Sequence, residues 1–280
     1  MKFSLSTNWC NRRIDDGRLI AEKALELGFG ELELGFHTTI EQVKGFKDML
    51  DRIPVGSVHA FCPVPLSAPQ GYPELYRFAS ANADERAIAV FHVKKNIEFA
   101  GEMGADTVVL HAGRAAADAF LPGKKRRLAK RANSGAKLIP HLLEALAKVV
   151  GDLEKHDVVL ALENLPYLEG FPDENEMETV LKNDFGGRVK AWFDTGHHRV
   201  REMNGWTCRR LGDDAYRGMH LNDVVGFEDD HFAPGFGKVD FAALKPLAQK
   251  VRHVVFEPSC TVEEADLKKG IATIRELWQC

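Results

Sequence analysis

The sequence predicts an α/β fold, a single (β/α)8 TIM barrel over residues 1–280, from three observations. Short apolar runs alternate with stretches long enough for one helix, a pattern typical of parallel β/α folds. The length of 280 residues is close to the roughly 250 residues of such barrels. Six apolar runs also lead into residues that bind metals well, and a barrel gathers the carboxyl ends of its strands around one mouth, where its active site lies. These residues are His59, His111, Glu163, Asp194, His220 and Glu257.

The first part of the chain predicts strands and helices with clear boundaries. Lys2–Thr7 is the expected opening strand, and Asp15 or Asp16 can cap a helix that ends at Gly28. The elements expected after it are a strand over Glu31–Leu34, a helix over Thr38–Leu50, a strand over Val55–Phe61, a helix over about Asp84–Met103 and a strand over Thr107–Leu110.

The second part repeats this alternation. Apolar residues at helical spacing predict one long helix over Lys137–Lys155. The elements expected after it are strands over Val158–Glu163, Val189–Asp194, Tyr216–Leu221 and Val254–Phe256, and helices near Glu174–Lys182, after Gly196, near Phe241–Val251 and over Val262–Trp278. An open doubly wound sheet is the competing fold, but its ligands lie at a switch point and not at the ends of every strand. Two connections, Cys62–Ala83 and Gly113–Gly135, are expected to be long functional loops.

Composition and charge narrow the class of protein. A chain that is 45% hydrophobic and 28% charged, with no apolar stretch of about 18 residues, is expected to be cytoplasmic and without a membrane partner. The five cysteines are odd in number and include no CxxC pair, which predicts reduced thiols. The net charge of −4 gives no global attraction to nucleic acid. The basic run Lys124–Arg131 is expected to be a solvated helix face, with a phosphate or nucleic-acid contact as the alternative.

Five motifs from the fifth strand onward gather carboxylates and imidazoles. They are Glu163-Asn164, Asp194-Thr195-Gly196-His197, His220-Leu221-Asn222-Asp223, Asp229-Asp230-His231 ahead of Gly235-Phe236-Gly237, and Glu257. With these motifs in this order, the chain resembles the xylose isomerase-like TIM-barrel superfamily. That superfamily contains sugar (phosphate) isomerases and epimerases together with endonuclease IV-type enzymes. The resemblance covers essentially the whole chain.

The resemblance to the sugar epimerases implies one metal ion and proton-transfer chemistry. In those enzymes four residues hold a divalent ion, and they match Glu163, Asp194, His220 and Glu257. Such a set suits Zn²⁺ or Mn²⁺, with Mg²⁺ or Co²⁺ as alternatives, and leaves positions open for substrate oxygens. Glu163 and Glu257 would then act as base and acid in proton transfer through an enediolate, with His197 stabilising the developing oxygen. The implied activity is that of a metal-dependent sugar or sugar-phosphate isomerase or epimerase.

The resemblance to the endonuclease IV-type enzymes implies instead that residues at the barrel mouth bind several metal ions. Those enzymes hold three zinc ions through nine ligands, a cluster suited to phosphoester hydrolysis. The nine matching residues are His59, His111, Glu163, Asp194, His197, His220, Asp229, His231 and Glu257. The flanks depart from this pattern, with Gly196 where a cysteine is usual and Asp230 where a basic residue is usual. A zinc phosphodiesterase or AP endonuclease is therefore the alternative function.

Residues beside these ligands are candidates for binding the substrate. They are His59, His111, Arg114, Asn222 and Trp9, the last of which could stack on a sugar ring. The expected partner is a small polyhydroxylated molecule, with or without a phosphate group. The Arg that often follows the strand-seven His in ketohexose epimerases is replaced by Val225 and Gly226. A metal-dependent dehydratase or lyase, a non-catalytic binding protein, and a monomer or homo-oligomer all remain open.

Overall fold

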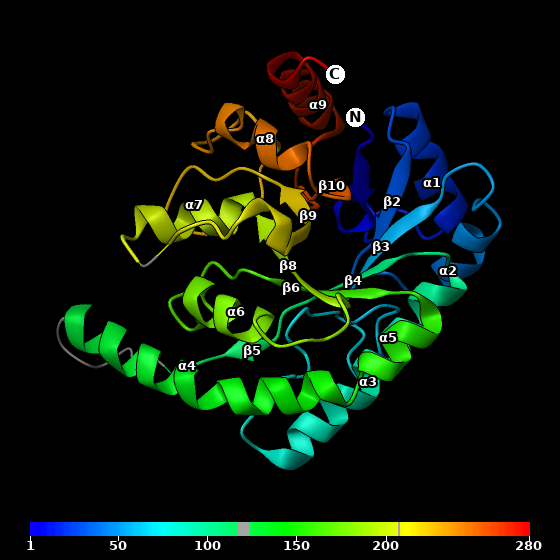
Figure 1. The fold of residues 1–280 in the computed structure, drawn as a ribbon. Helices are drawn as coiled ribbons and strands as arrows, with labels where there is room; N and C mark the ends of the chain where they lie inside the picture. The colour runs from blue at the N-terminus through cyan, green and yellow to red at the C-terminus, as the bar shows by residue number, and fades with distance from the viewer. Residues whose placement is uncertain (117–123, 207) are drawn as a thin grey trace.

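Eight parallel strands close into a barrel in the computed structural model, which describes residues 1–116, 124–206 and 208–280 and leaves out the side chains of 124–129 (Figure 1). Each strand pairs with two neighbours, and the order around the barrel is β1-β10-β9-β8-β6-β4-β3-β2. The strands are β1 (Ser4–Ser6), β2 (Glu31–Leu34), β3 (Val55–His59), β4 (Thr107–Leu110), β6 (Val159–Glu163), β8 (Val189–Asp194), β9 (Tyr216–Leu221) and β10 (His253–Phe256). The predicted fold class is confirmed.

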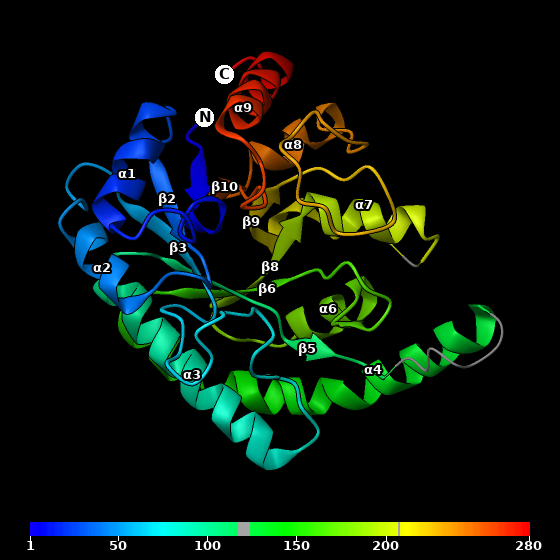
Figure 2. The same ribbon diagram turned by 180° about the vertical axis from the view of Figure 1, so that it is seen from behind.

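Helices surround the barrel, and a short antiparallel pair, β5 (Gly113–Arg114) and β7 (Gly170–Phe171), lies outside it (Figure 2). The α-helices are α1 (Gly17–Glu26), α2 (Ile40–Lys47), α3 (Ala83–Glu102), α4 (Lys124–Ala147), α5 (Val150–His156), α6 (Glu174–Leu181), α7 (Thr195–Met203), α8 (Lys245–Ala248) and α9 (Glu264–Trp278). Three 3-10 helices are η1 (Thr7–Trp9), η2 (Asp213–Ala215) and η3 (Ala242–Leu244). Within the described ranges, none of the helices has the length and apolar character needed to cross a membrane.

Helix starts follow from local sequence. Asp16 caps α1 by accepting a hydrogen bond of 2.8 Å from the Arg18 backbone N–H. Thr39 and Gln42 form a reciprocal capping box at the start of α2. The helix boundaries expected from Asp16 and Thr38 are therefore close to those observed.

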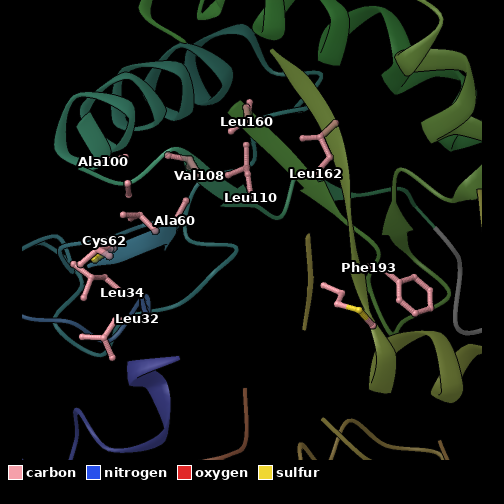
Figure 3. Close-up of a cluster of buried hydrophobic side chains, with 14 of the residues drawn as sticks. Leu32, Leu34, Ala60, Cys62, Ala100, Val108, Leu110, Leu160, Leu162 and Phe193 are labelled. Atoms are coloured by element: carbon pink, nitrogen blue, oxygen red, sulfur yellow. The ribbon is translucent and has the colours of Figure 1, made fainter. Parts of the chain in front are cut away.

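The strands separate an apolar outside from a largely polar inside. Alternate residues of a strand point to opposite faces, so the leucines of β2 face the helices while Glu31 and Glu33 face the barrel interior. Figure 3 shows the outer apolar layer between strands and helices. Its members include Leu32, Leu34, Ala60, Cys62, Ala100, Val108, Leu110, Leu160, Leu162 and Phe193.

A small apolar cluster fills the middle of the barrel. It consists of Val109, Ala161, Trp192 and Val255, all completely buried. The indole of Trp192 needs a glycine opposite it, because a Cβ atom on Gly218 would lie 2.2 Å from the Trp192 ring. This cluster separates the polar residues at the barrel mouth from those at its base.

The predicted connection over Gly113–Gly135 and the predicted long helix over Lys137–Lys155 are both wrong. The connection contains β5 and the first half of α4, and the helix is divided into α4 and α5 between Ala147 and Val150. Leu142, Leu146, Val149 and Leu153 are all completely buried. The apolar pattern thus continues across the break, so the sequence pattern predicts one helix and not two. The predicted helix near Phe241–Val251 is observed as two short helices, η3 and α8. Residues 62–82 form a long irregular connection, as expected.

Arg131 corrects the expectation that the basic run Lys124–Arg131 is a solvated face. Its side chain is 3% exposed, and Nη2 donates to Glu176 Oε2 over 2.8 Å. Nε donates to the Leu168 carbonyl over 3.0 Å. Arg131 therefore ties α4 to α6 and to the segment before β7, while the side chains of residues 124–129 lie outside the described part.

The base of the barrel holds a buried histidine between two carboxylates. His253 Nδ1 lies 3.0 Å from Glu31 Oε2, and its Nε2 lies 2.7 Å from Asp106 Oδ1. Arg217 adds a contact of 2.9 Å to Asp106. Burial lowers the pKa of His253, but Asp106 and Glu31 outweigh burial and raise the pKa above its usual value.

We expect His253→Gln to destabilise the protein by about 1–3 kcal/mol, and by more at about pH 6 than at about pH 9. Because the folded-state pKa of His253 is raised, its contribution is complete below the unfolded pKa and is lost as pH rises through the folded value. Urea denaturation of wild type and variant at both pH values measures this difference. His141→Gln, at a half-buried histidine on α4, is the control. An equal loss of stability at both pH values would contradict the prediction.

Candidate metal centre

Four of the expected ligands meet at the carboxyl ends of neighbouring strands. Glu163 ends β6, Asp194 ends β8, and His220 lies beside Asp194 in the β8–β9 register. Glu257 follows β10 directly. One ligand atom from each residue lies within 4.8 Å of the others, and His220 Nδ1 is 3.2 Å from Glu163 Oε1 and 3.1 Å from Glu257 Oε2. All four side chains are buried.

Glu163 is surrounded by imidazoles. His59 Nε2 and His111 Nε2 lie 3.1 Å and 3.2 Å from Glu163 Oε2, and His197 Nδ1 lies 3.4 Å from Glu163 Oε1. Neither ring nitrogen of His111 makes a well-formed hydrogen bond with any described residue. The His111 ring is therefore held mainly by its charge interaction with Glu163, and its nitrogens have capacity left for a further partner.

The donor set fits a divalent ion. Three carboxylates buried together repel one another, and they need a compensating positive charge. Three oxygens and one imidazole nitrogen suit Zn²⁺, Mn²⁺, Mg²⁺ or Co²⁺. In the absence of an ion the carboxylates attract protons to the imidazoles instead. Burial lowers the pKa of His220, yet Glu257 and Glu33 raise it well above its usual value.

The environments of Glu163 and Glu257 shift their pKa values in opposite directions. Burial alone would raise the pKa of both carboxyl groups. At Glu163 the imidazoles of His220 and His111 outweigh burial and hold the pKa well below its usual value. At Glu257 burial prevails and the pKa is raised. The two carboxyl groups of the site therefore lie in different electrostatic environments.

A second group of ligands lies next to the first. Asp229 bridges two imidazoles, with Oδ2 3.2 Å from His197 Nε2 and Oδ1 3.2 Å from His231 Nε2. Asp194 caps α7 by accepting a hydrogen bond of 2.7 Å from the His197 backbone N–H, which places the His197 ring at the barrel mouth. Burial lowers the pKa of His197, but Asp194 and Asp229 raise it to about 10.

All nine residues expected as ligands of one or several ions are thus brought to the barrel mouth. His59 is oriented by its Nδ1, which lies 3.0 Å from the Ala60 carbonyl oxygen. His231 Nδ1 lies 2.9 Å from the Glu257 carbonyl oxygen, and the His231 backbone is in the left-handed region at φ 49°. Ligand atoms of Asp194, His197 and His231 lie within 4.8 Å of one another, as do those of His59, Glu163 and His220.

Three residues expected to bind substrate take other positions. Trp9 is 3% exposed, and its Nε1–H donates to the Val262 carbonyl over 2.8 Å, so its ring does not face the mouth. Asn222 is completely buried and donates to Asp194 Oδ2 over 2.6 Å, so it orients that carboxylate. Arg114 lies at the rim, where it donates to Glu74 and its guanidinium lies 4.3 Å from the Tyr167 ring centroid. Trp9 and Asn222 are therefore corrections to the expected substrate contacts.

Glu33 was not predicted as a site residue, yet it contacts the candidate ligand His220 from inside the barrel. Its carboxylate is completely buried and lies 3.1 Å from His220 Nε2, and Ser57 Oγ donates to it over 2.8 Å. Glu33 thus favours a proton on Nε2 of His220 and leaves Nδ1 to face Glu163 and Glu257. The alternation of charged and apolar residues in Glu31–Leu34 was the available signal, because it places both glutamates inside the barrel.

A pocket of about 300 Å³ opens above these residues. Its floor is formed by ligand residues, and its wall carries Arg12, Tyr167 and Asp230. Asn8 also lines the pocket and donates from Nδ2 to Glu257 Oε1 over 3.2 Å. The arrangement can therefore accommodate a small polar molecule directly against the carboxylates of Glu163 and Glu257.

Solved structures with the same fold include several named as sugar epimerases. A D-tagatose 3-epimerase-like protein gives a TM-score of 0.71 at 20% identity and covers 100% of this chain and 97% of that chain. The 3-keto-D-glucoside 4-epimerase of E. coli gives a TM-score of 0.72 at 16% identity, with 99% of each chain covered. A D-psicose 3-epimerase gives a TM-score of 0.69 at 16% identity, with 100% of each chain covered. These likenesses show a shared fold.

Comparisons of the amino-acid sequence give a relative and a protein family. An uncharacterized protein of Methanocaldococcus jannaschii is 21% identical over 198 residues, which are 69% of this chain and 62% of that protein. The matched region thus spans less than two thirds of that relative. The family model for the xylose isomerase-like TIM barrel matches residues 21–277. This match covers most of the chain, including the ligand residues at the barrel mouth, and shows that the chain belongs to the xylose isomerase-like TIM-barrel family.

Proposed function

We propose that this protein is a divalent-metal-dependent isomerase or epimerase of a small sugar or sugar phosphate. The observation that carries the proposal is the buried group Glu163, Asp194, His220 and Glu257, of which Glu163 and Glu257 line a pocket of about 300 Å³. Zn²⁺ or Mn²⁺ suits this donor set best. Solved structures with the same fold that are named as epimerases support an activity of this general class.

The two glutamates of this group are the proposed base and acid. When bound, a divalent ion would polarise a substrate carbonyl and so acidify the neighbouring C–H group. Glu163 is the proposed base, which accepts the proton from carbon. Glu257, on another strand end of the same group, is the proposed acid that returns a proton to the substrate. His197 Nδ1 lies 2.7 Å from the Asn164 carbonyl oxygen, so Nε2, beside Asp229, would donate a hydrogen bond to the oxygen on which negative charge develops.

The pocket favours a small polyhydroxylated substrate over a nucleic acid. Its volume of about 300 Å³ matches a single sugar, and Asp229 and Asp230 place negative charge at its mouth. Arg12 lines the same pocket and would bind the phosphate group of a sugar phosphate.

A zinc phosphodiesterase is the second candidate, and the position of Asp229 between His197 and His231 favours it. These three residues, together with His59 and His111 against Glu163, would supply ligands for further ions. A bridged cluster of this kind would serve phosphoester hydrolysis. The number of ions required for activity therefore distinguishes the two functions.

We expect Glu163→Gln and Glu257→Gln each to lower turnover by about 10²–10⁴-fold, because each removes a group that transfers a proton. The measurement is interconversion of a panel of ketoses and ketose phosphates in D2O, with deuterium incorporated at the reacting carbon. Glu178→Gln, at an exposed residue of α6, is the control, and circular dichroism checks the fold of all three variants. Near-wild-type turnover in both active-site variants would refute the assignment.

His111→Ala separates isomerase from hydrolase. If one ion at the four-residue group suffices, the variant should keep that ion and lose only part of its activity, because none of the four ligands has changed. If activity needs a cluster, zinc content and activity should fall together. Elemental analysis and turnover are measured on the same samples, with His92→Ala on α3 as the control. Coupled loss of zinc and activity would overturn the isomerase proposal.

Glu33→Gln tests the residue behind His220. We expect metal affinity to fall by about 10–100-fold, because an amide holds the Nε2–H tautomer of His220 less strongly than a carboxylate does. Competition with a chelating dye measures the affinity for Zn²⁺ and Mn²⁺. Glu31→Gln is the matched control, since it lies on the same strand and faces His253 at the base. Equal affinities in wild type and Glu33→Gln would show that Glu33 has no such role.

A further inference from the structure

Glu74 is a buried carboxylate beside the barrel mouth that the proposed proton transfer does not use. It lies in the connection 62–82, where its neighbour Pro73 lines the pocket and Glu74 itself does not. Arg114 of β5 donates from Nε to Glu74 Oε2, and Nη2 of the same guanidinium donates to Tyr72 Oη over 3.1 Å. One oxygen of Glu74 therefore has a fixed partner.

The other oxygen of Glu74 faces His111. Glu74 Oε1 is buried and accepts no hydrogen bond from any described residue. It lies 3.9 Å from Nδ1 of His111, which is buried and also lacks a hydrogen-bond partner among these residues. An unpaired donor or acceptor is costly in a protein interior, and these two atoms are complementary. Their separation exceeds the length of a hydrogen bond by about 1 Å, which a small movement of either side chain would close.

The other candidate ligand histidines of the mouth show what is missing at His111. Each has one ring nitrogen held by an oxygen at hydrogen-bond distance, which leaves its second nitrogen for the site. These oxygens are the Ala60 carbonyl at 3.0 Å from His59 Nδ1, the Asn164 carbonyl at 2.7 Å from His197 Nδ1, the Glu257 carbonyl at 2.9 Å from His231 Nδ1, and Glu33 Oε1 at 3.1 Å from His220 Nε2. At His111 the oxygen in the corresponding position is Glu74 Oε1.

We propose that Glu74 is a positioning residue for His111: its Oε1 holds a proton on Nδ1, and Nε2 is thereby free to accept a hydrogen bond from a hydroxyl group of the substrate. Arg114 contributes indirectly, because it fixes the other oxygen of Glu74. The inference rests on the proposed function, since it requires a polyhydroxylated substrate in the pocket that His111 lines.

Two carboxylates compete for the proton of the His111 ring. Glu163 Oε2 lies 3.2 Å from Nε2 and favours a proton there in the metal-free protein. When Glu163 holds a divalent ion, the ion takes up the charge of this carboxylate, and Glu74 becomes the stronger acceptor. The proton then lies on Nδ1. Glu74 thus makes His111 an acceptor for the substrate once the ion is bound.

The tautomer of His111 tests the inference without an assay of activity. Zn²⁺-loaded protein is prepared with isotope-labelled histidine, the His111 signals are identified by their loss in His111→Ala, and long-range proton–nitrogen NMR correlations show which ring nitrogen carries the proton. We expect the proton on Nδ1 in the wild type. In Glu74→Gln it should move to Nε2, because the glutamine oxygen must accept from Arg114 Nε and its amide group then donates to Nδ1. Tyr72→Phe is the matched control and should keep the wild-type tautomer, since it removes a hydrogen bond to Arg114 and leaves Glu74 in place.

Turnover and metal content give a second measurement. We expect Glu74→Gln to lower the kcat of ketose interconversion by about 10–100-fold, with the metal content unchanged because none of the four ligands is altered. A wild type that converts no ketose would contradict the proposed function alone, since the tautomer is measured without substrate. The inference is overturned if the proton lies on Nε2 in Zn²⁺-loaded wild type, if Glu74→Gln leaves the tautomer unchanged, or if this variant has the wild-type kcat. The first of these outcomes does not depend on whether the variant folds.

Discussion

The buried carboxylate of Glu163 is the centre around which the barrel mouth is arranged. It has no exposure to solvent, and imidazoles from four different strand ends or helix starts converge on its two oxygens. An isolated carboxylate at this depth would be expensive, so the position requires cations or hydrogen-bond donors from every side. The histidines supply them in the metal-free protein, and the same geometry suits a divalent ion. Stability at this point of the fold and the capacity to bind metal therefore have the same physical origin.

The interior of the barrel keeps two polar systems apart. At the base, His253 lies between Glu31 and Asp106, and at the mouth, His220 lies between Glu33 and the ligand carboxylates. The apolar layer that contains Trp192 lies between them, and the Trp192 ring contacts both His220 and His253. Glu31 and Glu33, two residues apart on one strand, thus act in different environments.

Two proposed functions fit the mouth, because the candidate ligands for one ion or for several surround the same pair of carboxylates. The opposite pKa shifts of Glu163 and Glu257 suit proton transfer to and from carbon, whereas Asp229 between His197 and His231 suits further metal binding. The small volume of the pocket favours the first.

The sequence by itself determined the barrel, the positions of most strands and the polar residues at the strand ends, because these depend on local patterns. A strand end is marked by where an apolar run stops, and a polar residue there must face the mouth whatever its neighbours are. Tertiary structure decided which distant residues meet. The partnership of Glu33 with His220, the burial of Arg131 against Glu176, and the position of Trp9 against the Val262 carbonyl all join segments far apart in the chain. The break between α4 and α5 also escaped prediction, because the apolar pattern runs through it. Packing, which no local pattern records, determines each of these.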